Sequence, residues 1–120
     1  MILVDTSVWI DFLAGRAASA DLQSLLRGGD VACHPAVRGE VALGSIANRQ
    51  KVLGLLEALP RPAPIDDDGV LEFVERARLQ ATGIGWVDAH LLACAQKTSM
   101  PLWTHDRRLE RVARRLGVAR

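Results

Sequence analysis

Four carboxylates occupy positions in the sequence that suggest a common site: Asp5, Glu40, Asp88 and Asp106. Carboxylate oxygens are hard ligands, and a set without histidine or cysteine favours Mg²⁺ or Mn²⁺ over zinc. Ionised carboxylates held close together repel one another, and a divalent cation removes that conflict. A cation bound in this way can activate water and stabilise the charge that develops on a phosphodiester. The four residues therefore predict phosphodiester chemistry, provided that the fold brings them together.

The elements that must position these residues alternate between strands and helices. Short apolar runs predict strands at 2–4, 31–33 and 101–104, with further short strands at 63–65 and around Val118. Segments with helical periodicity lie between them. This alternation predicts a parallel sheet covered by helices, in a single α/β domain that spans residues 1–120.

Three of the carboxylates are expected at one edge of that sheet. In open parallel sheets, functional sites form at the carboxyl ends of the strands. Asp5 and Asp106 each come after a strand, so both are expected there. Asp88 lies in the first turn of a helix expected from about Trp86 to Lys97, and helix N-termini point to the same edge.

Glu40 is expected at the predicted site because of its position on a helix, not because it follows a strand. It falls in a helix expected to begin at Pro35, on a stripe that it shares with Ala36, Leu43 and Ala47. The stripe is otherwise apolar, and a carboxylate on such a stripe is seldom there by chance. We therefore expect Glu40 to point inward, toward the other three carboxylates.

Each of these residues also has a purely structural interpretation. An Asp after a strand is commonly a turn residue or a helix cap. Asp88 can complement the dipole of its helix, and Asp106 can cap the last one. The spacing alone leaves both interpretations open.

The composition limits the class of protein. The chain has 120 residues, 49% of them hydrophobic, which is enough for a core. Its formal net charge is +1, so any binding of nucleic acid must depend on local clusters of charge. Two cysteines, Cys33 and Cys94, are too few for a disulfide framework and are expected to be buried thiols. Because no apolar run approaches the ~20 residues of a membrane span, we expect a cytoplasmic protein.

Four segments resemble, in order, the motifs of VapC-type PIN domains, the ribonuclease toxins of bacterial toxin–antitoxin pairs. They are 2–11 (ILVDTSVWID), 39–44 (GEVALG), 87–93 (VDAHLLA) and 102–109 (LWTHDRRL). Together they span nearly the whole chain. The resemblance implies one PIN-like α/β domain, with a short parallel central sheet flanked by helices. It also implies endonucleolytic cleavage of RNA that depends on Mg²⁺ or Mn²⁺.

The same resemblance implies roles and partners. Asp5 and Asp88 would be the main metal ligands, and Glu40 and Asp106 would complete the catalytic pocket. The protein would form a homodimer and would be inhibited by a cognate antitoxin protein. The hydroxyl of Thr6 or Ser7 could lie beside the phosphate, although a hydroxyl after a strand is more often a local cap.

The third segment departs from the family pattern. Gly85-Trp86 stands where many relatives have a hydroxyl residue that caps the helix. In the fourth segment, His105 precedes the aspartate and could touch substrate. Structural roles are favoured for all three histidines, His34, His90 and His105.

A basic rim for RNA is expected on the last helix. Arg107, Arg108 and Arg111 follow Asp106 closely, on the side opposite the apolar face. Arginine forks suit phosphates. A solvated helix face is the alternative interpretation, and the sequence leaves both open.

An apolar groove for the antitoxin is expected near Asp5. Trp9, Phe12 and Leu13 are crowded into one short helix, and a domain of this size need not bury them all. An antitoxin helix could lie in such a groove. Trp9, Trp86 and Trp103 could also stack RNA bases, although core or interface positions are commoner for tryptophan.

Two other functions fit parts of the sequence. A receiver-type signalling domain also has an acidic Mg²⁺ pocket, but it needs a lysine at a strand end. Lys51 and Lys97 both fall in expected helices. A PIN-like scaffold that only binds a partner is the other alternative, and the intact carboxylates argue against it.

Overall fold

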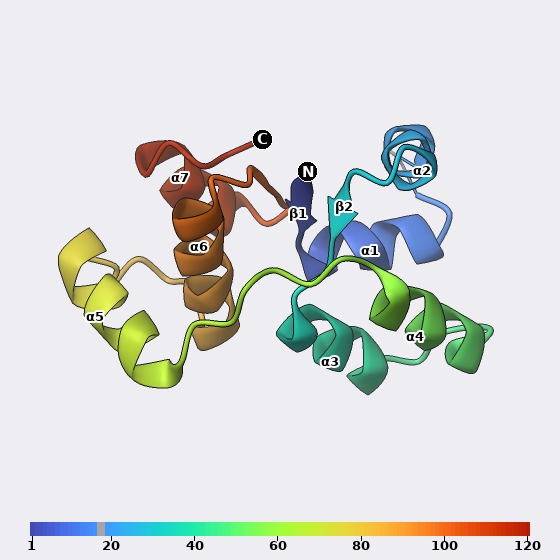
Figure 1. The fold of residues 1–120 in the computed structure, drawn as a ribbon, viewed down its shortest axis with the longest axis horizontal. Helices are drawn as coiled ribbons and strands as arrows, with labels where there is room; N and C mark the ends of the chain where they lie inside the picture. The colour runs from blue at the N-terminus through green and yellow to red at the C-terminus, as the bar shows by residue number, and fades with distance from the viewer. Residues whose placement is uncertain (17–18) are drawn as a thin grey trace.

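The structure is a computed structural model that describes residues 1–16 and 19–120. The strands are short: β1 (Ile2–Val4), β2 (Val31–Ala32) and β3 (Leu102–Trp103). The helices are α1 (Thr6–Leu13), α2 (Ser19–Arg27), α3 (Pro35–Leu43), α4 (Arg49–Ala58), α5 (Asp67–Ala77), α6 (Trp86–Thr98) and α7 (Arg107–Arg115). The three strands form a parallel sheet in the order β2-β1-β3 (Figure 1).

The central strand joins the two halves of the sheet. Leu3 lies opposite Ala32 of β2 and Leu102 of β3. Leu3 and Val4 are fully buried, as expected for a strand covered on both faces. The predicted parallel α/β fold is confirmed.

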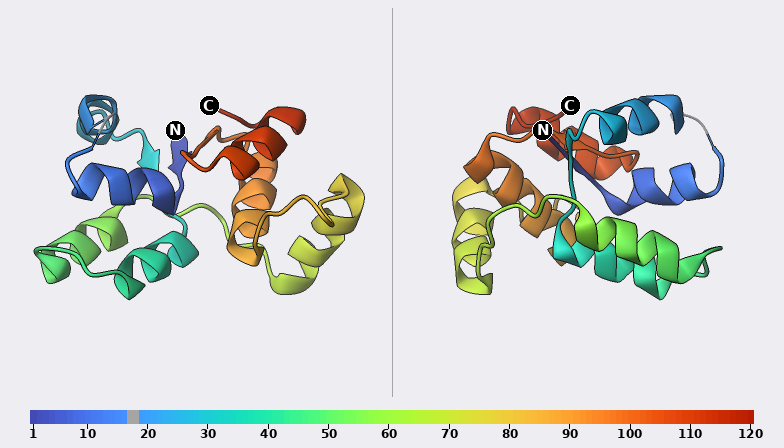
Figure 2. Two further views of the ribbon diagram at one scale, coloured as in Figure 1. Left: turned by 180° about the vertical axis from the view of Figure 1, so that it is seen from behind. Right: turned by 45° about the vertical axis from the view of Figure 1, so that its right-hand side comes forward.

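The helices form two groups beside the sheet. Helices α1 to α4 lie on one side, where α3 contacts both α1 and α4. Helices α5, α6 and α7 lie on the other side, and the left view in Figure 2 shows the two groups apart. In α6, the run Leu91–Ala95 is buried. No helix in the described part of the chain is long and apolar enough to cross a membrane.

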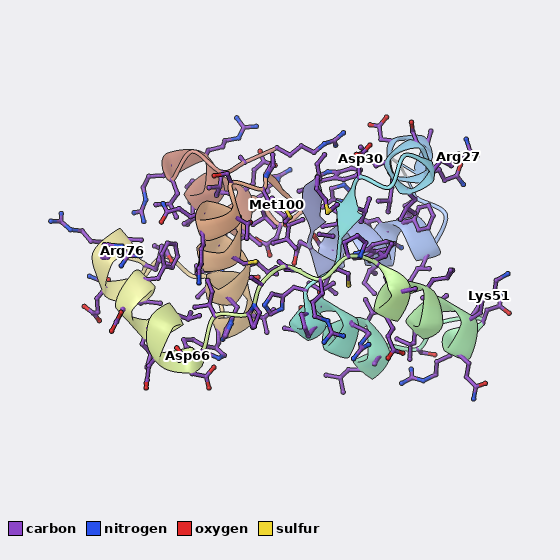
Figure 3. The ribbon with its side chains drawn as sticks, viewed as in Figure 1. Arg27, Asp30, Lys51, Asp66, Arg76 and Met100 are labelled. Carbon is purple, nitrogen blue, oxygen red and sulfur yellow. The ribbon has the colours of Figure 1, made fainter. Side chains whose placement is uncertain are left out.

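The carboxyl ends of the strands and the starts of several helices meet at one edge of the molecule. In Figure 1, β1 and β2 run downward, and α1 and α3 begin at their lower ends. Helix α6 also begins at this edge. Its C-terminal end is at the top in Figure 3, where Met100, two residues after the helix, is labelled, so its N-terminal end is at the bottom. Asp66 marks the lower end of α5 in the same view. This edge is where the predicted site belongs.

Some predicted elements are wrong. The segment at 63–65 is not a strand: within the described residues its backbone makes no ladder hydrogen bond, and the nearest such contact is at Pro60, whose carbonyl accepts from the Cys33 N–H at 2.9 Å. The strand expected around Val118 is reduced to a single bridge between Leu102 and Ala119. On α4, Leu56 is 3% exposed and belongs to the core, whereas the adjacent Leu55 is 60% exposed.

Candidate active site

Asp5 is the most deeply placed of the four carboxylates. It follows β1, is 5% exposed and caps the N-terminus of α1. Its Oδ2 accepts hydrogen bonds from the hydroxyls of Ser7 at 2.7 Å and Thr104 at 2.8 Å. Among the residues that the structure describes, no donor reaches Oδ1. One oxygen is therefore held by the protein, while the other keeps its lone pairs.

Thr104 is a site residue that the sequence analysis missed. It is 6% exposed, and its hydroxyl also accepts from the Asp106 N–H at 3.0 Å. The adjacent N–H of His105 donates to the Ser7 hydroxyl at 2.9 Å. Two hydroxyls thus join the chain after β1 to the chain after β3. A threonine at the end of a strand, two residues before an aspartate, is the pattern that could have revealed it.

Asp106 is exposed and caps α7. Its Oδ1 accepts from the backbone N–H groups of Arg108 at 2.9 Å and Leu109 at 3.0 Å. The structural interpretation of this residue is therefore correct. A cap uses one carboxylate oxygen, so it does not exclude a second role for the other.

Asp88 lies three residues into α6, where its Oδ2 accepts from the Gly85 N–H at 3.1 Å. Burial raises the pKa of the Asp88 carboxyl above its ordinary value, although this hydrogen bond opposes the shift. Three neighbouring carboxylates raise the pKa further: Asp5, Asp106 and Glu40. The negative charges of all three are close enough to affect the pKa of Asp88. The fold therefore groups the four carboxylates at one edge of the sheet.

Glu40 lies elsewhere on its helix than expected. The buried positions of α3 are Val37 and Val41, whereas Leu43 is 89% exposed and Glu40 is exposed as well. The prediction of an inward apolar stripe is wrong, because α3 packs through the adjacent face. Glu40 is nevertheless held at the site, since the Thr6 hydroxyl donates to its Oε1 at 2.6 Å.

The four carboxylates do not form a closed set of ligands in this structure. Within residues 1–16 and 19–120, no three acidic, histidine or cysteine side chains stand close enough together to hold a metal ion. Each carboxylate instead accepts a hydrogen bond from its own surroundings. Their chemistry suits a hard divalent cation, because the four donors are all carboxylate oxygens. The open lone pairs on Asp5 Oδ1 fit that interpretation.

Comparison with known proteins identifies the family. The profile of the PIN domain matches residues 2–115 of the chain. The chain belongs to the PIN-domain family. It is also 48% identical over 120 residues to Ribonuclease VapC32 of Mycobacterium tuberculosis (strain ATCC 25618 / H37Rv), covering 99% of this chain and 95% of the relative. The protein of the same name from strain CDC 1551 / Oshkosh matches with the same identity and coverage.

The arginines of α7 in this PIN domain differ in their surroundings. Arg114 pairs with Glu110 at 2.8 Å, and Arg115 donates to the Ala77 carbonyl at 2.7 Å, so both are engaged within the protein. The side chains of Arg107 and Arg111 make no hydrogen bond or ion pair within the described residues, and both are exposed. They remain available for an anionic ligand.

Arg108 lies against the turn that leads into α6. Gly83 adopts φ +84°, and a Cβ added there would stand 3.1 Å from Arg108 Cδ and 3.5 Å from its Nε. A glycine favours both this backbone conformation and the close approach. The side chain of Arg108 therefore lies against this turn, which precedes Asp88 in the chain.

The histidines have structural partners. His34 caps α3, since its Nδ1 accepts from the Ala36 N–H at 3.0 Å. His90 pairs with Asp67 at 3.3 Å. The His105 Nδ1 lies 2.5 Å from Asp11 Oδ2, and His105 together with Arg16 lowers the pKa of the Asp11 carboxyl.

Two apolar hollows lie against α1, which Asp5 caps, and against α6, which carries Asp88. The first, the α1–α4 groove, has a volume of about 320 Å³ and is lined by apolar side chains that include Trp9, Phe12, Leu13, Leu26, Leu55 and Leu56. The second, the α5–α6 hollow, has a volume of about 240 Å³ and is lined by Leu71, Val74, Ile84, Gly85, Trp86 and Ala89, among others.

Proposed function

We propose that this PIN domain is an endoribonuclease and the toxin component of a toxin–antitoxin pair. The observation that carries the proposal is the environment of Asp88, a half-buried carboxyl whose pKa is raised by burial and by three further carboxylates. Grouping four negative charges at one edge is unfavourable for the isolated protein, and such arrangements are typical of functional sites. The near-full-length similarity to a protein named a ribonuclease supports RNA as the substrate.

A divalent cation, Mg²⁺ or Mn²⁺, is the proposed cofactor. Asp5 and Asp88 would be its main ligands, and Glu40 and Asp106 would complete the pocket. When bound, it would supply an activated water and offset the charge on the phosphate. The protein's own contribution is orientation: Ser7 and Thr104 fix the Asp5 carboxylate, and Thr6 fixes Glu40.

Arg107, Arg108 and Arg111 are the proposed RNA contacts. An acidic pocket repels RNA, so its rim must supply positive charge. The side chains of Arg107 and Arg111 have no partner in the described part of the protein, and Arg108 is held beside the start of α6. Such contacts bind phosphate and carry little information about base identity.

The α1–α4 groove is the proposed binding site for a segment of the antitoxin. Trp9, Phe12 and Leu13 line it, and α1 begins beside Asp5, so a basic side chain of the bound segment could reach the carboxylates. We further propose that the protein acts in the cytoplasm, where its RNA substrate is, and that it does so as a homodimer.

The proposal is tested by RNA cleavage with purified protein. Asp5→Asn and Asp88→Asn should each reduce cleavage in Mg²⁺ or Mn²⁺ by at least about 100-fold, while Asp21→Asn, an exposed change on α2, should leave it unaltered. Mg²⁺ should raise the melting temperature of the unaltered chain but not of Asp88→Asn. Full nuclease activity in excess chelator would refute the metal-dependent mechanism. A folded protein that cleaves no RNA would favour the scaffold that only binds.

A further inference from the structure

Trp86 differs from the other two tryptophans in its exposure. Trp9 and Trp103 are 3% and 9% exposed, so neither can stack a base on its ring face without rearrangement. Trp86 is 44% exposed, although it stands in the first turn of α6, two residues before Asp88. It also meets the His90 ring edge to face at a centroid distance of 4.8 Å, which supports one side of the indole.

The hollow beside Trp86 shares one residue with the surroundings of Asp88. Gly85 lines the hollow, and its N–H donates to Asp88 Oδ2 at 3.1 Å. One residue therefore borders both the apolar surface and a proposed catalytic carboxylate. Leu71, on the opposite wall, is 52% exposed, so the apolar surface is open to a ligand.

A positive charge lies against a turn residue one position along the chain from the lining of the same hollow. The guanidinium group of Arg108 lies against Gly83, and the next residue, Ile84, lines the hollow. An apolar wall, an exposed aromatic ring and a guanidinium group on the turn that enters the hollow correspond to the three parts of a nucleotide site: surface for the base, a stacking partner and a phosphate contact. The volume, about 240 Å³, is below the 300–1,000 Å³ typical of drug-sized ligands, which suits one base.

We infer that the α5–α6 hollow is a subsite for one unpaired base of the RNA substrate, which stacks on Trp86 while Arg108 contacts an adjoining phosphate. The inference rests on the proposed ribonuclease function and adds to it the place where one base of the substrate is held. Stacking accepts any base, because every base has a π face, and it favours the larger purines. A base held in this hollow places its neighbouring phosphodiester toward Asp88.

The test compares two probes that carry the same charge. A single-stranded oligoadenylate of about eight nucleotides and an abasic ribose-phosphate oligomer of equal length are each bound to chains that carry Asp88→Asn, which prevents cleavage. In that background Trp86→Ala should weaken binding of the oligoadenylate by roughly 5- to 100-fold. It should leave binding of the abasic oligomer unchanged. Trp86→Phe should retain most of the affinity.

Two controls make the result specific. Leu43→Ala removes another exposed apolar side chain, 89% exposed and outside the hollow, and should affect neither probe. Far-UV circular dichroism of each variant checks that α6 is retained. If Trp86→Ala weakens both probes equally or neither, the inference is wrong.

The remaining outcomes distinguish failure of the base subsite from failure of the proposed ribonuclease function. If Trp86→Ala turns a dimer into a monomer at constant concentration in sedimentation experiments, the hollow is an interface between copies and the inference is overturned. If the unaltered chain cleaves RNA while Trp86→Ala leaves the discrimination between probes intact, only the subsite fails. If the unaltered chain cleaves no RNA in Mg²⁺ or Mn²⁺, the proposed function fails with it.

Discussion

The α1–α4 groove and the α5–α6 hollow are both apolar, and each contains a tryptophan close in sequence to a carboxylate of the site. They differ in what the tryptophan does. Trp9 is 3% exposed and belongs to the core, so the groove is a fixed apolar surface that suits a protein segment. Trp86 is 44% exposed, and the Arg108 guanidinium group lies against Gly83 of the turn that leads to it, which suits an anionic ligand with an aromatic part. Exposure and neighbouring charge, more than residue type, separate a structural aromatic from a binding one.

The largest expected difference between the two regions is in stability. Trp9→Ala should lower the free energy of unfolding by about 3–5 kcal/mol, because it leaves a cavity in the core. Trp86→Ala should cost no more than about 1 kcal/mol, as expected for a partly exposed side chain. Urea denaturation of the two variants measures both values. Equal losses would contradict the division of roles.

Trp9→Phe is the matched control for that experiment. The Trp9 Nε1 is buried and has no hydrogen-bond partner among the residues that the structure describes. Since phenylalanine removes this unsatisfied donor along with part of the ring, the change should cost much less than Trp9→Ala.

The next largest effect is on the affinity for the two proposed ligands, the antitoxin and RNA. Leu55 in the groove and Leu71 in the hollow are 60% and 52% exposed, so either can be changed to Asp with little effect on folding. Leu55→Asp should weaken antitoxin binding by about 30-fold or more and spare RNA binding. Leu71→Asp should do the reverse, and calorimetric titration with each ligand measures both. Loss of both ligands in one variant would show that the regions are not independent.

The location of the site at the edge of the sheet could be predicted from the sequence, but the orientation of every side chain there could not. Asp5 follows a short apolar run that has to be a strand, so its position could be predicted. Glu40 could not be placed correctly, because helical periodicity on α3 fits two adjacent faces and only packing against α1 and α4 selects Val37 and Val41. The exposure of Trp86 was equally hidden, since it depends on how the turn at 79–85 crosses the start of α6.

A smaller effect concerns the contact between the two groups of helices. His34 caps α3 and meets His90 of α6 at a ring-centroid distance of 5.8 Å. Burial lowers the pKa of His34, and the nearby His90 lowers it further. Because the folded-state pKa lies below the unfolded one, the stability contributed by neutral His34 is complete above about pH 6.5 and is lost as the pH falls through the folded-state value.

His34→Asn tests this effect because asparagine caps without titrating. The unaltered protein should lose up to about 1 kcal/mol of stability, the value of a cap, between pH 7 and pH 5. The variant should lack this component, and denaturant titrations across that range compare the two. Parallel pH profiles would show that His34 is not the group responsible.

The smallest expected effect is that of Asp88, which lies next to the α5–α6 hollow, on the melting temperature. The pKa of Asp88 is raised, so its stability contribution is present at low pH, where the group is neutral, and is lost as the pH rises through the folded-state value. In metal-free protein at neutral pH, Asp88→Asn should therefore raise the melting temperature by at most a few degrees, and the gain should shrink in acid. Differential scanning calorimetry measures it. A lower melting temperature would mean that the charge on Asp88 is stabilising.

The double use of the carboxylates as helix caps affects how such a toxin can be lost during evolution. Asp5 and Asp106 each accept backbone hydrogen bonds at a helix start, and asparagine can make the same bonds. One nucleotide change converts an aspartate codon to an asparagine codon. Under the proposed function, a lineage that silences the enzyme in this way keeps a folded protein with its groove intact. That silent protein still sequesters antitoxin, so its gene continues to influence any active copy in the same cell.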